Sequence, residues 1–319
     1  MKKIYVVGGA NVDLLARSFN EIVPADSNPG HVSYSFGGVA HNIACNLAKM
    51  GCYVDFVTAL SNDAFGKQVK NHCLSSELHL DHCQYFDEYS TSLYVAIVQP
   101  DGEMNVAVSD MEVLSHLDVD EVCKVLKDSE YNDLVVLDTN LTEEQIAKLI
   151  NSCHNNVFVD PISTTKAVKI MPFLENLYFL KPNHIEAAHM TGIECTSISG
   201  CIENLRYFLA HGVENIVISM GEKGVIASDG EDSYLIENIP TEVVSTTGAG
   251  DSFMAGYIYG QYHEKTFLDS LFYAMASSRI TLGSQETVNP DMSSELLENN
   301  FKEVKENARL AKLDIQEHK

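Results

Sequence analysis

Short apolar runs alternate with amphipathic stretches along most of the chain. The runs that predict strands are residues 4–9, 53–60, 133–138, 156–160, 177–181 and 215–220. The stretches that place apolar residues at helical spacing are residues 40–50, 142–151, 183–191 and 201–211. Because the strand runs are almost continuously apolar, they indicate a parallel sheet that helices cover on both faces. We therefore expect an α/β fold of three layers with a mainly parallel central sheet.

Two segments depart from this alternation. Residues 14–36 and 92–110 alternate apolar and polar positions, and Asp101-Gly102 divides the second segment as a hairpin turn would. Together they predict a small β-sheet that covers one edge of the α/β core as a lid. We expect a single domain over residues 1–319 with these segments inserted in it. The charge-rich tail, residues 293–319, predicts a solvated terminal helix.

Charge and composition restrict the class of ligand. The 319 residues include 21 basic and 45 acidic side chains, a net charge of −24. Such a charge repels nucleic acid and anionic membrane surfaces, so neither is expected as a partner. No apolar stretch approaches the roughly 20 residues that span a bilayer, and the start of the chain lacks the features of a signal peptide. We expect a cytoplasmic protein with a small-molecule ligand.

The cysteines and histidines show no pattern that indicates a site. None of the eight cysteines forms a CxxC pair, and the twelve histidines form neither an HExxH motif nor a legible hydrolase triad. We expect reduced thiols without a catalytic role, and no tight cluster of metal ligands.

The sequence TTGAGD at residues 246–251 opens a helical stretch. Small residues at a helix start leave backbone N–H groups accessible, and the helix dipole favours an anion there. Asp251 places a carboxylate beside this predicted phosphate site, where it can accept a proton from an attacking hydroxyl. A tight turn followed by an acid in the first helical turn explains the same residues. The motif is not a Walker A loop, because no GxxxxGK[ST] sequence occurs.

Two polar clusters near the start suggest a hydroxyl-binding site. Gly38 allows a ligand to approach the backbone closely, and the amide of Asn42 can bind a hydroxyl. Asn11 and Asp13 follow the first predicted strand, at the edge where open α/β sheets bind ligands, and Asp13 can hold a vicinal diol. A glycine turn before a core helix and a solvent-facing aspartate are the alternatives.

Two further clusters follow predicted strands. Asn183 and Glu186 share one face of a helix start, where the carboxylate can hold Mg²⁺ through water. A plain helix cap explains them equally well. Ser219, Gly221 and Gly224 end a strand and suit either the approach of a nucleotide or a turn into the next strand.

The order of these motifs resembles a known family. GGVAHNIACNLAKMG at residues 37–51 and TTGAGDSFMAG at residues 246–256 resemble the two signatures of the ribokinase-like (PfkB) sugar and nucleoside kinases. ANVD, KPNHIEA and SMGEKG match that family in the same order. The resemblance implies an α/β core with a β lid, and phosphorylation of an alcohol group with ATP and Mg²⁺.

The resemblance also implies roles for individual residues. Asp251 becomes the general base, and Gly248, Ala249 and Gly250 form the anion hole. The sugar is held by Asp13, Gly38 and Asn42, and the lid residues that contact the base or close over it are Asp26, Ser27 and Asn28. The ATP side is lined by Asn183, Ser219, Gly221 and Gly224, with Glu186 for Mg²⁺. Many relatives carry Asp at the position of Ser245, where it helps bind a monovalent cation, so activation by potassium is in doubt.

Additional segments bear on the substrate. They resemble the pseudouridine kinases within the family, and they are residues 25–30, 102–104 with 110–111, 159–161 with Lys166, and 287–291. We therefore expect phosphorylation of the 5′-hydroxyl of pseudouridine. The alternatives are a kinase for ribose or another nucleoside, a nucleoside-binding protein without activity and, more remotely, a dehydrogenase. Family members often pair through the lid, so we also expect a homodimer.

Overall fold

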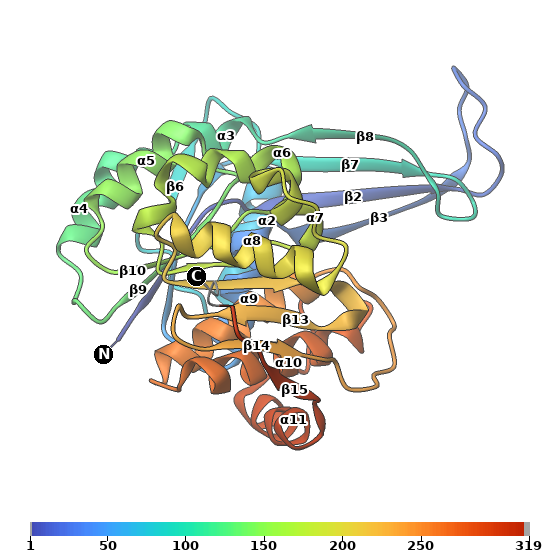
Figure 1. The fold of residues 1–319 in the computed structure, drawn as a ribbon. Coiled ribbons are helices and arrows are strands. Elements are labelled where there is room, and N and C mark those ends of the chain that lie inside the picture. Colours follow the sequence, from blue (N-terminus) through green and yellow to red (C-terminus); the bar gives the residue numbers. More distant parts are fainter. Residues whose placement is uncertain (1, 316–319) are drawn as a thin grey trace.

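The computed structural model describes residues 2–315, which are built around a nine-stranded sheet (Figure 1). The strand order is β15-β14-β13-β12-β11-β10-β9-β1-β4. Neighbours from β12 to β4 pair in parallel, whereas β13, β14 and β15 form an antiparallel edge. The bounds are β1 (Ile4–Val7), β4 (Val54–Val57), β9 (Leu134–Asp138), β10 (Asn156–Asp160), β11 (Phe179–Leu180), β12 (Asn215–Ser219), β13 (Val225–Ser228), β14 (Ser233–Ile236) and β15 (Leu310–Lys312). The expected mainly parallel sheet is confirmed.

Helices cover both faces of this sheet, because each central strand is apolar on both sides. In β9, Val136 belongs to one hydrophobic core, whereas Val135 and Leu137 belong to the other. The helices of the first core are α1 (Val39–Lys49), α2 (Ala64–Ser75), α9 (Ala249–Tyr262), α10 (Phe267–Leu282) and α11 (Ser294–Asn307). Those of the second are α3 (Glu112–Ser115), α4 (Val119–Lys127), α5 (Glu143–Ser152), α6 (Thr164–Ala167), α7 (His184–Thr191) and α8 (Ile198–Ala210).

A separate four-stranded sheet, here called the lid sheet, projects from the main body (Figure 1). Its order is β3-β2-β7-β8, with β2 (Asn11–Ser18), β3 (Gly30–Gly37), β7 (Leu93–Val98) and β8 (Met104–Asp110). The two segments with alternating hydrophobicity therefore meet in one sheet. A third sheet pairs β5 (Ala59–Ser61) with β6 (Gln84–Phe86).

Two predicted elements differ in detail. Residues 53–60, predicted as one strand, divide into β4 and β5, which belong to different sheets. The tail does not remain helical, because β15 follows α11 and pairs with β14 at the edge of the main sheet. Residues 316–319 of the predicted tail helix lie outside the described residues. Within residues 2–315, none of the helices combines the length and apolar character needed to cross a membrane.

Candidate active site

The parallel strands bring polar side chains together at one edge of the main sheet. Asp138 and Asp160 are the last residues of β9 and β10, and Lys181 follows β11 directly. Because parallel strands all end at the same edge, these side chains lie side by side although they are far apart in sequence. The N-termini of α1 and α9 border the same edge, because Asn42 of α1 contacts Asp251 of α9 and Asp138 accepts from the N–H of Ala40.

The predicted anion site lies at the start of α9. Gly248 has φ 81°, and a Cβ atom there would lie 2.1 Å from the carbonyl oxygen of Thr287, so the turn requires glycine. Ala249 and Gly250 form the first turn, whose backbone N–H groups lack partners within the helix. A helix start of this kind binds phosphate oxygens.

Asp251 lies next to this helix start and connects the two sequence signatures. Nδ2 of Asn42 donates a hydrogen bond to Oδ2 of Asp251, with 2.8 Å between the two atoms. The two residues are 209 positions apart in the chain. The structure therefore places a carboxylate and an amide together at the predicted anion site, an arrangement that suits proton transfer beside a phosphoryl group.

The surroundings of Asp251 favour its neutral form. Burial and the nearby charge of Asp160 raise its pKa to about 7, against the opposing effects of Asn42 and Lys181. A carboxylate with a pKa near neutrality can both accept and release a proton at cellular pH. The environment of Asp251 thus suits a general base.

The predicted sugar-binding residues lie in β2 and at the start of α1. Asp13, in β2, accepts a hydrogen bond from Nδ2 of Asn11 over 2.6 Å, and burial raises its pKa. Gly38 precedes α1 with φ 103°, and a Cβ atom there would lie 2.4 Å from the carbonyl oxygen of Gly9. The loop after β1 and the start of α1 are therefore in direct contact, which places Asp13 and Asn42 on neighbouring segments.

An ion pair at this edge has no assigned role in the sequence analysis. Nζ of Lys181 lies 3.1 Å from Oδ2 of Asp160, and each residue is only 5% exposed. Burial alone lowers the pKa of Lys181, but the carboxylates of Asp160 and Glu186 outweigh it and raise that pKa. The sequence does contain a signal for Lys181. A charged residue directly after an apolar strand run lies at the edge of a parallel sheet where ligands bind.

Asp138 is a second residue that the sequence analysis missed. Its carboxylate accepts hydrogen bonds from the N–H groups of Gly9 and Ala40, and from the backbone and side chain of Asn140. These contacts hold the loop after β1 against the start of α1. Asp138 therefore positions the backbone around Gly38.

The predicted ATP-side residues lie at the start of α7 and at the end of β12 with the turn that follows it. Asn183 and Glu186 form a reciprocal cap at the start of α7, in which Oδ1 of Asn183 accepts from the N–H of Glu186 and Oε2 of Glu186 accepts from the N–H of Asn183. Asn183 also bridges to Ser219 at the end of β12. Gly221 and Gly224 lie in the turn after β12, where the Cβ position of Gly221 faces open space.

The acidic groups near Glu186 fit a hydrated Mg²⁺. Burial raises the pKa of Glu186, and Asp160 raises it further. The charges of Asp160, Glu186 and Asp251 all raise the pKa of Lys181, and Asp160 forms an ion pair with it. Mg²⁺ takes oxygen ligands and retains several waters, which suits carboxylates that already accept hydrogen bonds from the protein.

The predicted lid residues Asp26, Ser27 and Asn28 lie elsewhere. They belong to the loop between β2 and β3, at the far end of the lid sheet (Figure 1). Asn28 hydrogen-bonds to Val23 and to the carbonyl oxygen of Asp26, so the loop is held by its own side chains. The structure brings the other predicted site residues to the sheet edge, but not these three.

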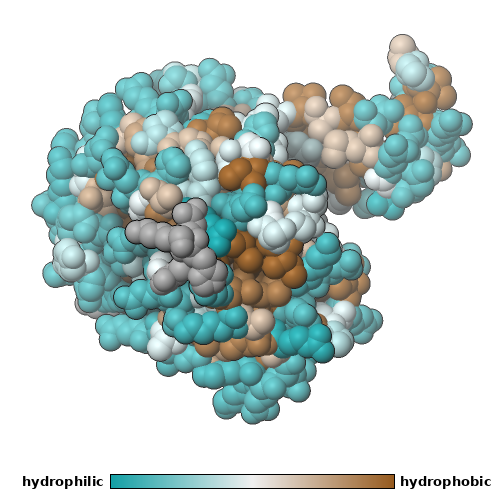
Figure 2. Space-filling model, in the orientation of Figure 1, coloured by the Kyte–Doolittle hydropathy of each residue, from teal (hydrophilic) through white to brown (hydrophobic). Residues whose placement is uncertain are grey.

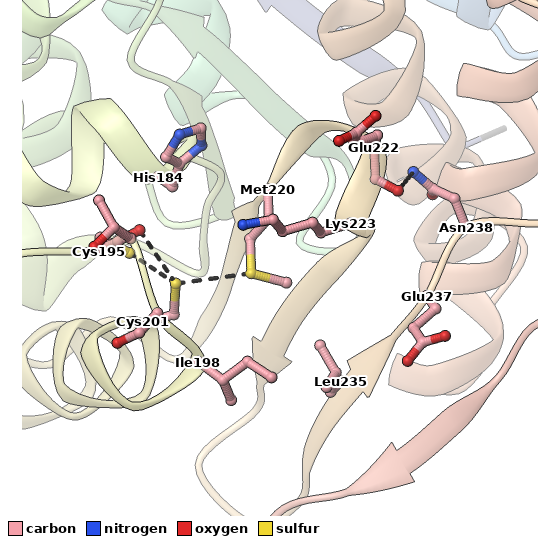
Figure 3. Close-up of a pocket in the computed structure, with 12 residues that line it drawn as sticks. His184, Cys195, Ile198, Cys201, Met220, Glu222, Lys223, Leu235, Glu237 and Asn238 are labelled. Carbon is pink, nitrogen blue, oxygen red and sulfur yellow. Dashed lines mark hydrogen bonds between the residues drawn. The ribbon is translucent and has the colours of Figure 1, made fainter.

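A cavity of about 590 Å³ lies next to the ATP-side residues (Figure 3). Its lining comes from the starts of α7 and α8, the turn after β12 and the end of β14. Met220, Glu222 and Lys223 belong to the same turn as Gly221, but the predicted site residues do not line the cavity. The site at the carboxyl edge is therefore assigned from its polar groups and helix starts and not from the volume of this cavity.

Comparisons with known proteins identify the family. The profile of the pfkB family carbohydrate kinases matches residues 1–294. The chain belongs to the PfkB family. Pseudouridine kinase from Escherichia coli K12 is 33% identical over 293 residues, which cover 91% of this chain and 93% of that protein.

Solved structures confirm the ribokinase-like fold. A putative sugar kinase from Clostridium perfringens is 30% identical, covers 98% of both chains and has a TM-score of 0.85. Ribokinase from Arabidopsis thaliana, solved with ribose and ATP, has a TM-score of 0.81 at 20% identity over 94% of this chain and 98% of that one. This PfkB protein is accordingly a phosphotransferase that acts on a hydroxyl group.

Proposed function

We propose that this kinase transfers the γ-phosphoryl group of ATP to the 5′-hydroxyl of pseudouridine, giving pseudouridine 5′-phosphate and ADP. The observation that carries the chemistry is the contact between Asn42 and Asp251 at the start of α9. It places a carboxylate of raised pKa beside a helix N-terminus, the pairing that phosphoryl transfer to a hydroxyl requires.

In the proposed step, Asp251 accepts the proton of the 5′-hydroxyl while that oxygen bonds to the γ-phosphorus. The bond between this phosphorus and the β–γ bridging oxygen breaks, and ADP leaves. The N–H groups of Gly248, Ala249 and Gly250 stabilise the charge on the phosphoryl oxygens. Asn42 holds the Asp251 carboxylate in place, and Asp13 and Gly38 position the ribose.

The similarity to the Escherichia coli pseudouridine kinase supports the choice of substrate. Pseudouridine carries a ring N–H that uridine lacks, because its glycosidic bond is made to carbon. A polar pocket can discriminate strongly between two such analogues.

In this proposal, ATP binds along Asn183, Ser219, Gly221 and Gly224, and Glu186 holds a hydrated Mg²⁺. The metal ion supplies charge neutralisation to the phosphates when it is bound. A monovalent cation is the remaining cofactor to test. The hydroxyl of Ser245 accepts a hydrogen bond from the N–H of Thr247, next to the anion site.

The lid sheet supports self-association. Its pairing places Val32, Tyr34, Ile97, Val106 and Val108 on one face, opposite the face that carries Asp13. All five are exposed, and Figure 2 shows apolar residues along the projecting sheet. We propose that this apolar face pairs with a second copy.

A substrate panel tests the proposal. ADP release is measured with ATP and Mg²⁺ for pseudouridine, uridine, adenosine, ribose and fructose, with potassium and sodium compared, and phosphorus NMR locates the phosphate. A strong preference for pseudouridine with a 5′-phosphate product is expected. Preference for ribose or another nucleoside would overturn the substrate but keep the mechanism. Binding of pseudouridine without turnover of any compound would instead indicate a nucleoside-binding protein.

A further inference from the structure

Three side chains with metal-binding atoms meet where α1 passes α2. His41 and Cys45 lie one turn apart on α1, and His72 lies in the last turn of α2. Nε2 of His41 is 3.4 Å from Sγ of Cys45, and one ligand atom from each of the three residues lies within 4.8 Å of the others. The sequence predicts no such cluster, and this prediction is wrong because His72 joins the other two only in the folded chain.

The spacing of His41 and Cys45 fits two ligands of a tetrahedral metal ion. Bonds of about 2.0 Å to nitrogen and about 2.3 Å to sulfur place neighbouring ligand atoms roughly 3.5 Å apart. His41 and Cys45 already have this separation. His72 places its ligand atom within 4.8 Å of both. This residue is partly exposed at the end of its helix, where an ion can enter, and its ring stacks on that of Phe36.

The protonation states also suit a metal site. Burial lowers the pKa of His41 to about 4 and also lowers the pKa of His72, which disfavours the charged imidazolium form. The neutral imidazole is the form that binds a metal. Burial raises the pKa of the Cys45 thiol to about 12, so this residue binds a metal only by releasing its proton.

A hydrogen bond outside the cluster orients His41. Nδ1 of His41 lies 3.2 Å from Oδ1 of Asn42. When Nε2 binds a metal, the ring proton resides on Nδ1 and is donated to this amide oxygen. Metal-ligating histidines usually donate their second N–H in this manner. The same contact turns Nδ2 of Asn42 towards Asp251, so an ion at His41 stabilises the orientation of the amide next to the proposed base.

We propose that His41, Cys45 and His72 bind one divalent ion of the zinc class, with water as the fourth ligand. The ion displaces the proton of Cys45, which passes to solvent, and no electron is transferred. This site is separate from the Mg²⁺ that accompanies ATP, because a thiolate and imidazoles favour zinc whereas Mg²⁺ favours oxygen ligands. The inference does not depend on the identity of the nucleoside.

Cobalt titration of the metal-free full chain tests the site directly, without an activity assay. The expected result is a thiolate-to-cobalt absorption band that saturates at one equivalent, together with the visible bands of a tetrahedral ion. Zinc should abolish both and raise the thermal midpoint. Absence of the thiolate band in the unaltered chain overturns the proposal.

Matched variants assign the ligands. Cys45→Ser should lose the thiolate band, and His72→Asn should weaken cobalt binding by at least about tenfold. Cys52→Ser, at another buried thiol, and His79→Asn, at an exposed imidazole, should bind cobalt as the unaltered chain does. Thermal unfolding without metal verifies that each variant is folded. Loss of the band in Cys52→Ser, or its retention in folded Cys45→Ser, would contradict the assignment.

Discussion

The two larger sheets of this protein use similar residues for different purposes. Strand β9 of the main sheet, with the sequence LVVLD, is buried at all five positions. Strand β8 of the lid sheet, with the sequence MNVAVSD, is exposed at six of its seven. Valine is frequent in both, so the difference lies in what covers the strands. The main sheet is enclosed by helices, whereas one face of the lid sheet keeps its apolar side chains available.

This contrast decides how firmly each candidate residue is held. Asp138 and Asp160 end buried strands, and their carboxylates have partners from several segments of the chain. Asp26 at the tip of the lid sheet is placed only by its own loop. We therefore expect substitutions at the edge of the main sheet to affect chemistry and stability strongly, and substitutions on the lid sheet to affect association.

The largest expected effect is on catalysis, at Asp251. Asp251→Asn removes the proposed base and should reduce kcat by about 10²- to 10⁴-fold. Because the ionised carboxylate is unfavourable in this site, stability falls as pH rises from the ordinary carboxyl pKa of 3.8 through about 7. The variant should therefore unfold at the same temperature as the unaltered chain, or higher, at pH 8. Steady-state kinetics and thermal unfolding measure the two effects.

A matched control for this variant is Asp128→Asn, an exposed acid at the end of α4, which should keep full activity. Turnover of Asp251→Asn within tenfold of the unaltered enzyme contradicts the base assignment.

The next largest effect is on stability, at the buried ion pair. Lys181→Met leaves Asp160 buried without its partner and should lower the free energy of unfolding by about 3–5 kcal/mol. The double variant Lys181→Met with Asp160→Asn should recover part of this loss, because no charge of the pair is then left unpaired. Urea denaturation measures both.

The exposed pair of Lys148 and Asp120 provides the comparison. Lys148→Met should cost less than about 1 kcal/mol, because water already screens that pair. If Lys181→Met and Lys148→Met lowered the free energy of unfolding equally, residues at the edge of the main sheet would be held no more firmly than those on the surface.

A smaller effect is expected from Asn42. In the unaltered enzyme, kcat should rise with pH through about 7 as Asp251 loses its proton. Asn42→Ala removes a donor that favours the carboxylate, so the pKa of Asp251 rises and the acid limb of the profile moves to higher pH. Turnover at pH 7 should fall roughly 10- to 100-fold, as for loss of a hydrogen bond to a charged group.

The pH profile distinguishes this role from simple damage to the fold. Asn307→Ala, at an exposed asparagine in α11, should leave the profile unchanged. If Asn42→Ala loses turnover equally at every pH, the contact with Asp251 does not tune the base.

The smallest energetic effect is expected on the lid sheet. Val108 is 65% exposed, so Val108→Asp should change the free energy of unfolding by less than about 0.5 kcal/mol. The proposed pairing with a second copy should nevertheless weaken, because a charge enters its apolar face. Sedimentation equilibrium measures the mass.

Ser109→Asp places the same charge on the opposite face of β8 and should leave the mass unchanged. A monomeric unaltered protein, or equal dissociation by both substitutions, would exclude pairing through the apolar face.

Much of the fold could be predicted, because local patterns reflect burial. The runs that became β9 and β10 are apolar at successive positions, as a sheet covered on both faces requires. The antiparallel edge was harder, since β15 has three exposed residues and owes its conformation to pairing with β14. Its sequence contains no alternation that would distinguish a strand from the end of a helix.

For the candidate site, the sequence by itself determined which chemical groups are present. The glycines before α9 and the acid in its first turn are local features, because backbone conformation and helix dipoles act over a few residues. The roles of Lys181 and Asp138 required the structure, because their partners come from other strands and loops. Only the tertiary structure decided that Asn42 faces Asp251 and that His72 meets His41 and Cys45. Contacts between helices depend on how the whole core packs, which no local pattern in the chain specifies.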